Sequence, residues 1–379
     1  MQRSSHGSEA EGSGATSEFG PAVYERSLAE LSREMASGGL TSEAAVNAYS
    51  ERVRALDHSG PHLGSVIELN PGALDDARAL DAERRAKGPR GPLHGVPILL
   101  KDNIATADRT RTAAGSLALA ESFAPHDSGV AQRLRAAGAV LLGKANMSEW
   151  ANFRSTRSVS GWSGRGGQCR NPYALDRSPS GSSSGSGVAT AASLCAAAVG
   201  TETDGSIVGP SSANGVVGFK PTVGHVSRAG IIPIAHSQDT AGPMARTVED
   251  AVLLLAAMQG ADPNDAATAS VPAGAYVGAA DVLRPGGLEG VRLGVVRGFV
   301  DAHPEVELQF TALLEALRAA GALLVDGLAM PKLGEWRAAE LEVLLYEFKH
   351  GVNAYLEGLP DGGQPRTLEE VIEFNGANA

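Results

Sequence analysis

One pattern occurs twice along this chain: a helical stretch, a glycine that ends it, and a run of apolar residues. The first copy, residues 129–146, reads GVAQRLRAAG and then AVLLGKAN, and Asp127 or Ser128 can cap its helix. The second copy, residues 308–327, follows the apolar run VRLGVVRG. Helices that alternate with apolar strands predict right-handed crossovers and a largely parallel sheet covered by helices. The pattern therefore predicts an α/β fold.

Two earlier stretches add elements to this fold. Residues 24–56 carry two helical patterns separated by Gly38-Gly39, and Thr41 can cap the second pattern. Residues 92–104, PLHGVPILLKDNI, contain a short apolar strand that ends at Lys101. The sequence therefore predicts two helices followed by a buried strand in the first third of the chain.

Composition limits the classes of protein to which the chain can belong. The 379 residues are 43% hydrophobic but only 4% aromatic, which suits an α/β core of small and aliphatic side chains. The net charge of −11 argues against nucleic acid or an anionic membrane as the main partner. Cys169 and Cys195 are expected to be free thiols, and no metal-ligand spacing is present. We therefore expect neither a metal nor another cofactor.

The first residues bear on domain organisation and location. Residues 1–20 are polar and rich in Ser and Gly, so we expect a disordered tail before a single α/β domain over residues 21–379. This tail lacks the apolar centre of a secretory signal, and no stretch reaches the roughly 18–20 apolar residues of a membrane helix. A cytoplasmic protein without membrane contact is the expectation.

Lys101 is the first candidate for chemistry. It directly follows the apolar run VPILL. Burial at the end of a strand lowers the pKa of an amine and favours the neutral form, which can accept a proton. The alternative is an ordinary strand-end lysine whose ammonium group reaches solvent.

A Ser/Gly-rich stretch, SPSGSSSGSG over residues 178–187, is the second candidate. A flexible linker has this composition. However, the small-residue run GVATAASLCAAAV follows directly, which places the glycines and serines at the N-terminus of a buried helix. Residues 181–185 also fit a G-x-S-x-G nucleophile elbow centred on Ser183, but no strand precedes them, so we reject that interpretation.

The third candidate is the turn TDGS over residues 203–206, which interrupts two apolar stretches. Gly205 can adopt backbone conformations closed to other residues, so the successive amides can form a nest that stabilises an oxyanion. Ser206 at the end of the turn could then attack a carbonyl group. The alternative is a structural βα turn.

A Ser-His-Asp triad would need a histidine beside Ser206. The nearby candidates are His94, His126, His225 and His236. None of them lies in a recognisable motif, so we interpret each as structural or exposed.

Taken together, four segments resemble the amidase signature family of serine hydrolases: GVPILLKDN, SPSGSSSGSG, GTETDGSIVGP and GVVGFKPTVGHVSRAGIIPIAHSQDTAGPMART. Their order and the 24-residue separation of Ser182 from Ser206 match that family. The resemblance covers residues 24–260 well and the rest more loosely. It implies a large mixed, mostly parallel twisted sheet covered by helices on both faces.

The resemblance also implies a Ser-cisSer-Lys triad. Ser206 matches the nucleophile that forms the acyl-enzyme, and Ser182 matches the bridging serine that follows a cis peptide bond. Lys101 matches the base that takes the proton through Ser182. The oxyanion hole would be formed by four backbone amides, those of Thr203, Asp204, Gly205 and Ser206.

The expected substrate is a small-molecule or peptide amide, and ammonia is the expected product. The stretches EWANFRSTRSVSGWSGRGGQ and TETDGSIVGP resemble the bacterial peptide-amidase branch, which deamidates C-terminal carboxamides. We expect the loop over residues 152–168 to form a wall of the substrate site. The predicted substrate-binding residues are Ser155, Thr156, Gln168 and Asp239.

Two alternatives remain. One is the glutaminase component of an aminoacyl-tRNA amidotransferase, which pairs with other subunits and handles tRNA. The acidic net charge counts against it, and so does Val208, where that branch has a basic residue.

The other alternative is an inactive scaffold. The chain is shorter than the family domains and stops within a helical pattern at TLEEVIEFNGANA, which suggests truncation at the C-terminus. The oligomeric state does not follow from the sequence.

Overall fold

The computed structural model of the chain describes residues 20, 22–272, 274–276, 278–297, 303–329 and 334–378. The predicted tail over residues 1–20 lies outside this part, Gly20 excepted. The chain forms two compact units, one of Met1–Tyr276 with Glu347–Ala379 and the other of Val277–Tyr346. Each unit is therefore described by itself, and the single domain expected over residues 21–379 stays a prediction.

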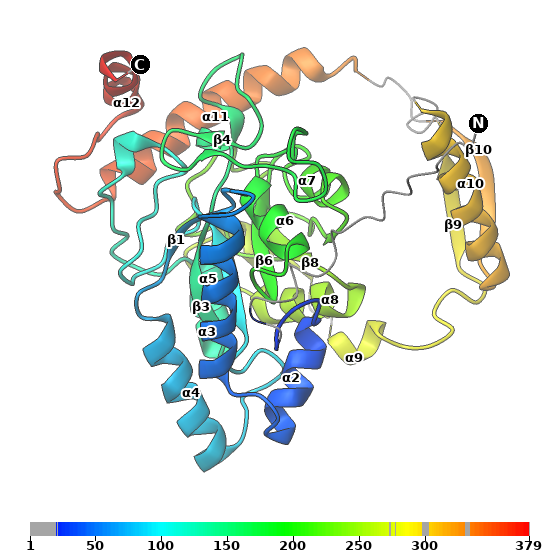
Figure 1. The fold of residues 1–379 in the computed structure, drawn as a ribbon. Coiled ribbons are helices and arrows are strands. Elements are labelled where there is room, and N and C mark those ends of the chain that lie inside the picture. Colours follow the sequence, from blue (N-terminus) through cyan, green and yellow to red (C-terminus); the bar gives the residue numbers. More distant parts are fainter. Residues whose placement is uncertain are drawn as a thin grey trace, which may run out of the picture. The chain divides into compact units, whose positions relative to one another are not determined.

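The first unit is built on a mixed sheet with the strand order β1-β3-β2-β6-β8-β7 (Figure 1). The inner strands β3, β2 and β6 are parallel, whereas β1, β8 and β7 pair antiparallel with their neighbours. Every residue of the strands β2, β3, β6 and β8 is buried. The strands are β1 (Val66–Leu69), β2 (Pro97–Lys101), β3 (Val140–Ala145), β6 (Ala197–Glu202), β7 (Val217–Gly218) and β8 (Thr240–Ala245).

The early helices and the first repeat form as predicted. Helices α2 (Leu28–Ser37) and α3 (Ser42–Arg52) have Gly38-Gly39 between them, and Thr41 caps α3 by accepting the Ala44 amide. Ser128 caps α5 (Gly129–Ala136) in the same way, and the chain then turns at Gly138 into β3. Since Gly138 has a φ of +83°, which favours glycine, the helix ends where the sequence predicts.

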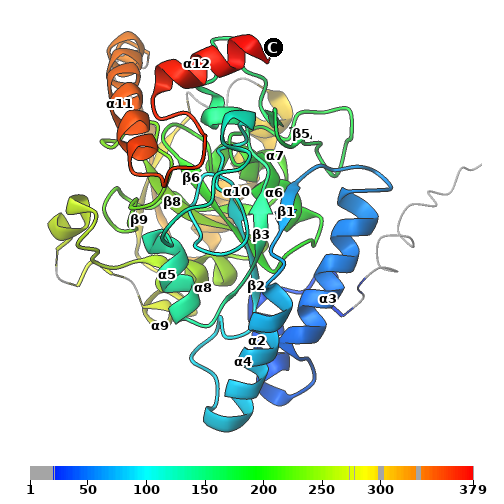
Figure 2. The same ribbon diagram turned by 90° about the vertical axis from the view of Figure 1, so that its left-hand side faces the viewer.

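Helices flank the sheet, which confirms the predicted α/β fold class. Helix α6 (Ser184–Ala191) packs on β2, β3, β6 and β8, and α8 (Val248–Met258) packs on β6, β7 and β8. Helices α5 and α8 also lie side by side, as Figure 2 shows. The aliphatic core between these layers includes Ile98, Leu99 and Val199, all without solvent exposure.

The remaining elements of the first unit are shorter or lie around this core. Trp162–Ser163 and Gly167–Gln168 pair as the small hairpin β4–β5 at the end of the loop over residues 152–168. The other helices are α4 (Ala73–Lys87), α7 (Val208–Ala213) and α12 (Leu368–Ala377), and the single-turn helices are η1 (Val53–Asp57), η2 (Leu117–Leu119), η3 (Glu149–Asn152) and η4 (Ala266–Ser270).

The second unit contains the second copy of the repeated pattern. Strands β9 (Arg292–Val296) and β10 (Leu323–Leu328) pair parallel, and α10 (Pro304–Ala319) connects them. The predicted helix–glycine–strand order is therefore confirmed here too, in a sheet separate from the first. The short helix α9 (Ala279–Val282) precedes β9, and α11 (Arg337–Glu357) runs from this unit into the first. Among the described helices, none has the length and apolar character needed to cross a bilayer.

Candidate active site

The site lies where strands β2 and β6 end. Lys101 is the last residue of β2, and Glu202 is the last residue of the neighbouring parallel strand β6. The carboxyl ends of parallel neighbours meet at one edge of a sheet, where open α/β folds bind ligands. Helix α6 begins at Ser184 and packs on both strands, so Ser182 and Ser183, which precede it, reach the same edge.

Lys101 is fully buried and contacts three oxygen atoms. Its Nζ lies 2.8 Å from Ser182 Oγ, 2.8 Å from Thr201 Oγ1 and 3.2 Å from the Thr201 carbonyl oxygen. Burial lowers the pKa of Lys101 to about 7, because the ammonium form loses its hydration; the carboxylates of Asp239 and Glu202 oppose this effect. A substantial fraction of this amine is therefore neutral near pH 7.

The serines before α6 are fixed by backbone contacts. The Gly181–Ser182 peptide bond is cis, and the Ser182 carbonyl accepts the Ser148 amide at 3.0 Å. The Ser183 hydroxyl donates to the Thr201 carbonyl at 3.0 Å and accepts the Thr201 amide at 3.2 Å. The Ser183 hydroxyl is thus bonded to the backbone of β6, while the Ser182 hydroxyl faces Lys101.

The turn after β6 leaves a set of amides without partners. Within the part of the chain that the structure describes, the N–H groups of residues 203–206 donate no hydrogen bond. The next two amides, of Ile207 and Val208, both donate to the Glu202 carboxylate, at 2.6 and 2.9 Å. Gly205 has a φ of +81°, which permits the tight turn. Successive free amides in a turn can bind an anion, so an oxyanion hole formed by these four residues stays a prediction.

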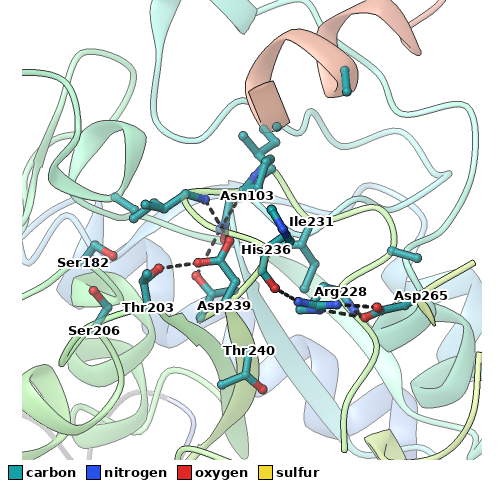
Figure 3. Close-up of a pocket in the computed structure, with 18 of the residues that line it drawn as sticks. Asn103, Ser182, Thr203, Ser206, Arg228, Ile231, His236, Asp239, Thr240 and Asp265 are labelled. Atoms are coloured by element: carbon teal, nitrogen blue, oxygen red, sulfur yellow. Dashed lines mark hydrogen bonds and ion pairs between the residues drawn. The ribbon is translucent and has the colours of Figure 1, made fainter. Parts of the chain in front are cut away.

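A cavity of about 360 Å³ opens beside this turn. Ser182 and Ser206 lie at one end of it and the Arg228–Asp265 ion pair at the other, as Figure 3 shows. The Ser206 hydroxyl has no hydrogen bond to any residue drawn there. Residues 231–234, of sequence IIPI, give the cavity an apolar wall between these ends. This wall offers an apolar surface to a ligand that fills the cavity.

Asp239 is the one predicted substrate-binding residue that lines this cavity. Its carboxylate accepts the Thr203 hydroxyl on one oxygen and the amides of Ile234 and Ala235, at 2.9 and 3.0 Å, on the other. Burial raises the pKa of Asp239, although these hydrogen bonds oppose the shift. Asp239 thus joins the turn that carries Ser206 to the apolar wall.

The other three predicted substrate-binding residues lie elsewhere. Ser155 and Gln168 line a separate cavity of about 270 Å³ with Trp162, and Thr156 lines neither cavity. No residue of the loop over residues 152–168 lines the cavity beside Ser206 in this structure, although the preceding residue, Ala151, does. A role for these three residues in substrate binding stays a prediction.

Several residues that line the cavity were not predicted from the sequence. Asn103 lies two residues after Lys101 and donates its side-chain amide to Thr201 Oγ1 at 3.1 Å. Arg228 and Asp265 form a bidentate pair, and His350 reaches the cavity from α11. The motif around Lys101 could have indicated Asn103. Nothing local in the sequence indicates His350.

The histidines and cysteines fill other roles. His94 is buried against the Leu80 carbonyl, and His225 packs against the Tyr276 ring, so neither lines the cavity. His126 lines a neighbouring cavity, and His236 lies at the cavity with its backbone carbonyl bound by Arg228.

Cys169 and Cys195 are buried free thiols, as expected. Within the described ranges, no three His, Cys, Asp or Glu side chains gather to hold a metal ion.

With this geometry in place, comparisons with known proteins show the family. The amidase family model matches residues 44–378. The peptide amidase of Stenotrophomonas maltophilia superposes with a TM-score of 0.89 at 51% identity, over 93% of this chain and 72% of that one. This likeness confirms the fold predicted from the family resemblance.

Two sequence relatives point the same way. A probable amidase of Arabidopsis thaliana is 46% identical over 89% of this chain and 65% of its own length. A component of the glutamyl-tRNA(Gln) amidotransferase of Salinispora arenicola is 42% identical over 91% of this chain and 70% of its own length. The chain thus spans under two thirds of the Arabidopsis relative. From the extent of the family match and of these similarities, we conclude that the chain belongs to the amidase family, also called the amidase signature family.

Proposed function

We propose that the chain hydrolyses a carboxamide through Lys101, Ser182 and Ser206, with an acyl-enzyme on Ser206. The observation that carries this proposal is the 2.8 Å contact between the buried Lys101 amine and the Ser182 hydroxyl, at the cavity end that also holds Ser206. The turn that carries Ser206 contains the unpartnered amides of residues 203–206. A buried neutral amine can act as a base, and an amide nest can stabilise an oxyanion.

The chemistry would run in two halves. Neutral Lys101 accepts the Ser182 proton, Ser182 accepts the Ser206 proton, and the Ser206 oxygen attacks the amide carbonyl. The developing oxyanion lies against the amides of residues 203–206. When the C–N bond breaks, the proton returns along the same groups to the leaving nitrogen. Water then cleaves the ester by the same relay and frees Ser206.

The relay requires a hydrogen bond between the two serine hydroxyls. Ser182 and Ser206 line the same end of the cavity, and no hydrogen bond shown in Figure 3 occupies the Ser206 hydroxyl. The relay would form this bond through a change in the side-chain rotamer of Ser206. The two contacts of Lys101 with Thr201 hold the amine in place meanwhile.

The substrate we propose is a peptide amide or small-molecule amide that releases ammonia. The apolar wall of residues 231–234 suits an acyl group with an apolar side chain, and the likeness to the peptide amidase supports the same class. A second candidate, glutaminase activity within an amidotransferase assembly, is favoured by the similarity to the Salinispora amidotransferase component. In that case glutamine would be the substrate and other subunits would be partners.

An ammonia-release assay tests these proposals. The panel comprises peptide amides, free amino-acid amides, aliphatic amides and glutamine, and each is tried with the wild-type chain and the Ser206→Ala variant. We expect turnover of peptide amides by the wild type and a loss of at least roughly a thousandfold in the variant, because the nucleophile is absent. Turnover of glutamine alone would favour the second candidate. Equal turnover by both proteins, or none by the wild type, would overturn the proposal and favour an inactive scaffold.

A further inference from the structure

We propose that Glu202 is a positioning residue: its carboxylate fixes the turn that carries Ser206, and its charge acts on the Lys101 amine. This inference rests on the proposed function, because it assumes that Lys101 is the base. It assigns one residue two separable effects, one of geometry and one of electrostatics. Glu202 belongs neither to the predicted triad nor to the predicted oxyanion hole.

The geometric effect follows from two short hydrogen bonds. Glu202 is buried at the end of β6, and its Oε2 accepts the Ile207 amide at 2.6 Å and the Val208 amide at 2.9 Å. These bonds join the chain before the turn to the chain after it. The amides of residues 203–206 lie between the two anchor points and are left for a ligand.

The other side of the turn is held by a second carboxylate. Asp239 accepts the Thr203 hydroxyl, and the same side chain accepts the Ile234 and Ala235 amides of the cavity wall. Two buried carboxylates therefore hold the turn, Asp239 at its start and Glu202 at its end. Together they restrict the positions of both Thr203 and Ser206.

The electrostatic effect follows from the surroundings of Lys101. Its direct contacts, Ser182 and Thr201, are uncharged. The carboxyl groups that act on it are those of Asp239 and Glu202, and both raise the pKa of Lys101 against the effect of burial. The carboxylate of Asp102, the next residue, instead binds Arg165 and the Gly115 amide. Glu202 directly follows Thr201, whose hydroxyl and carbonyl oxygens contact the Lys101 amine, so its charge lies close to that amine and raises its pKa.

Two conservative variants separate the effects. Glu202→Gln keeps a carbonyl oxygen at the right reach for both amides but removes the charge. Glu202→Asp keeps the charge but is one methylene shorter, so it cannot hold both amides in the observed geometry. The readout is the rate at which a fluorophosphonate labels Ser206 as a function of pH, which needs no knowledge of the natural substrate.

For the wild type we expect labelling to rise with pH through about 7, the pKa of Lys101. In Glu202→Gln the rise should move to lower pH by about one unit, because the ammonium form loses a neighbouring negative charge. In Glu202→Asp the rise should stay in place, while the plateau rate falls by roughly tenfold. A Glu202→Gln profile that does not move, or a Glu202→Asp plateau equal to the wild type, would overturn the inference.

Asp57→Asn is the matched control. Asp57 is also buried and also accepts two backbone amides, of Ser65 and Val66 at 2.7 and 2.9 Å, but it is not among the charges that act on Lys101. Asp57→Asn should lower stability without moving the pH profile of labelling; a profile that moved as far as in Glu202→Gln would overturn the inference.

If Glu202→Gln does not fold, Asp239→Asn should move the pH profile of labelling in the same direction, and an unmoved profile would count against the electrostatic effect.

Lys101→Ala separates failure of this inference from failure of the proposed function. If Lys101 is the base, the variant should label slowly at every pH and show no rise near pH 7. If the variant labels as fast as the wild type, the proposed function is wrong and the Glu202 inference falls with it. If Lys101→Ala labels slowly but Glu202→Gln is unshifted, only the inference is wrong.

Discussion

Two buried lysines on neighbouring strands differ in what their amines touch. Lys101 on β2 contacts the Ser182 hydroxyl, whereas Lys144 on β3 donates to the Ile104 carbonyl and to Thr112 Oγ1. Burial lowers the pKa of both, to about 7 for Lys101 and about 8 for Lys144. Only Lys101, of the two, is bonded to a residue that lines the cavity with Ser206. A lowered pKa therefore does not by itself identify the base.

Lys101→Ala should affect amides and esters unequally. Amide turnover should fall by roughly a thousandfold, because both activation of Ser206 and protonation of the leaving nitrogen are lost. Ester turnover should fall less, since an alcohol leaving group needs less protonation. The comparison of kcat/KM for an amide and an ester with the same acyl group measures this. Lys144→Met serves as control and should leave the amide-to-ester ratio unchanged; equal losses on both substrates in Lys101→Ala would contradict the assignment.

At the scale of elements, the site depends on how closely α6 approaches the edge of the sheet. The Gly185 amide donates to the Asn146 carbonyl at 2.9 Å, just beyond the end of β3. A Cβ on Gly185 would lie 2.2 Å from the Ser65 carbonyl oxygen and 2.5 Å from both Asn146 N and O, which are all backbone atoms. The first turn of α6 can therefore occupy its place only with glycine at this position.

Gly185→Ala should displace the start of α6 and with it Ser182. We expect a loss of about 1–3 kcal/mol in the free energy of unfolding, as for other overpacked core sites. Fluorophosphonate labelling of Ser206 should slow by at least roughly tenfold, since the contact of Ser182 with Lys101 is disturbed. Thermal unfolding and labelling rates measure the two effects.

Gly187→Ala, one half-turn along the same helix, is the matched control. Its Cβ would meet Asn214 Nδ2 and the Pro210 carbonyl oxygen at 3.1 Å, so small shifts can accommodate it. We expect smaller losses of stability and labelling than in Gly185→Ala. Wild-type stability and labelling in Gly185→Ala would show that α6 tolerates displacement and would contradict the argument.

At the scale of the whole molecule, buried ionisable groups make stability depend on pH. The folded-state pKa values of Lys101 and Lys144 lie below the ordinary value of 10.5, so the unfolded chain binds more protons between about pH 7 and pH 10.5. Stability therefore rises with pH in this range. Burial raises the pKa of the thiols of Cys169 and Cys195, which has the opposite effect once unfolded thiols ionise. The net increase of stability with pH is therefore confined to about pH 7–9.

The midpoint of thermal unfolding should accordingly increase from pH 7 to pH 8.5. Each lysine contributes up to about 1.4 kcal/mol per pH unit to the free energy of unfolding. Lys101→Met should raise the midpoint at pH 7, because the variant has no amine at this position that must lose its proton on folding. It should also make the midpoint depend less steeply on pH. Calorimetry of both proteins at several pH values measures this. A slope unchanged by Lys101→Met would mean that Lys101 is not held in its neutral form.

The sequence by itself determined the local elements. Caps such as Thr41 and Ser128, the glycine at position 138 and the apolar runs around Leu99 and Leu141 act over a few residues, so they could be recognised before any contact was known. The α/β fold class follows from their alternation. The association of Lys101, Ser182 and Ser206 came from the family resemblance, since spacing alone left each with a structural alternative.

Only the tertiary structure decided which distant residues meet. Lys101 and Ser182 are 81 positions apart, yet their contact depends on the order of strands and on the close approach of α6. The same holds for His350 at the cavity, and for Ser155 and Gln168 in a separate one. The physical reason is that hydrogen bonding and periodicity act locally along the chain, whereas burial, pKa and cavity shape depend on packing between segments whose pairing the local pattern does not specify.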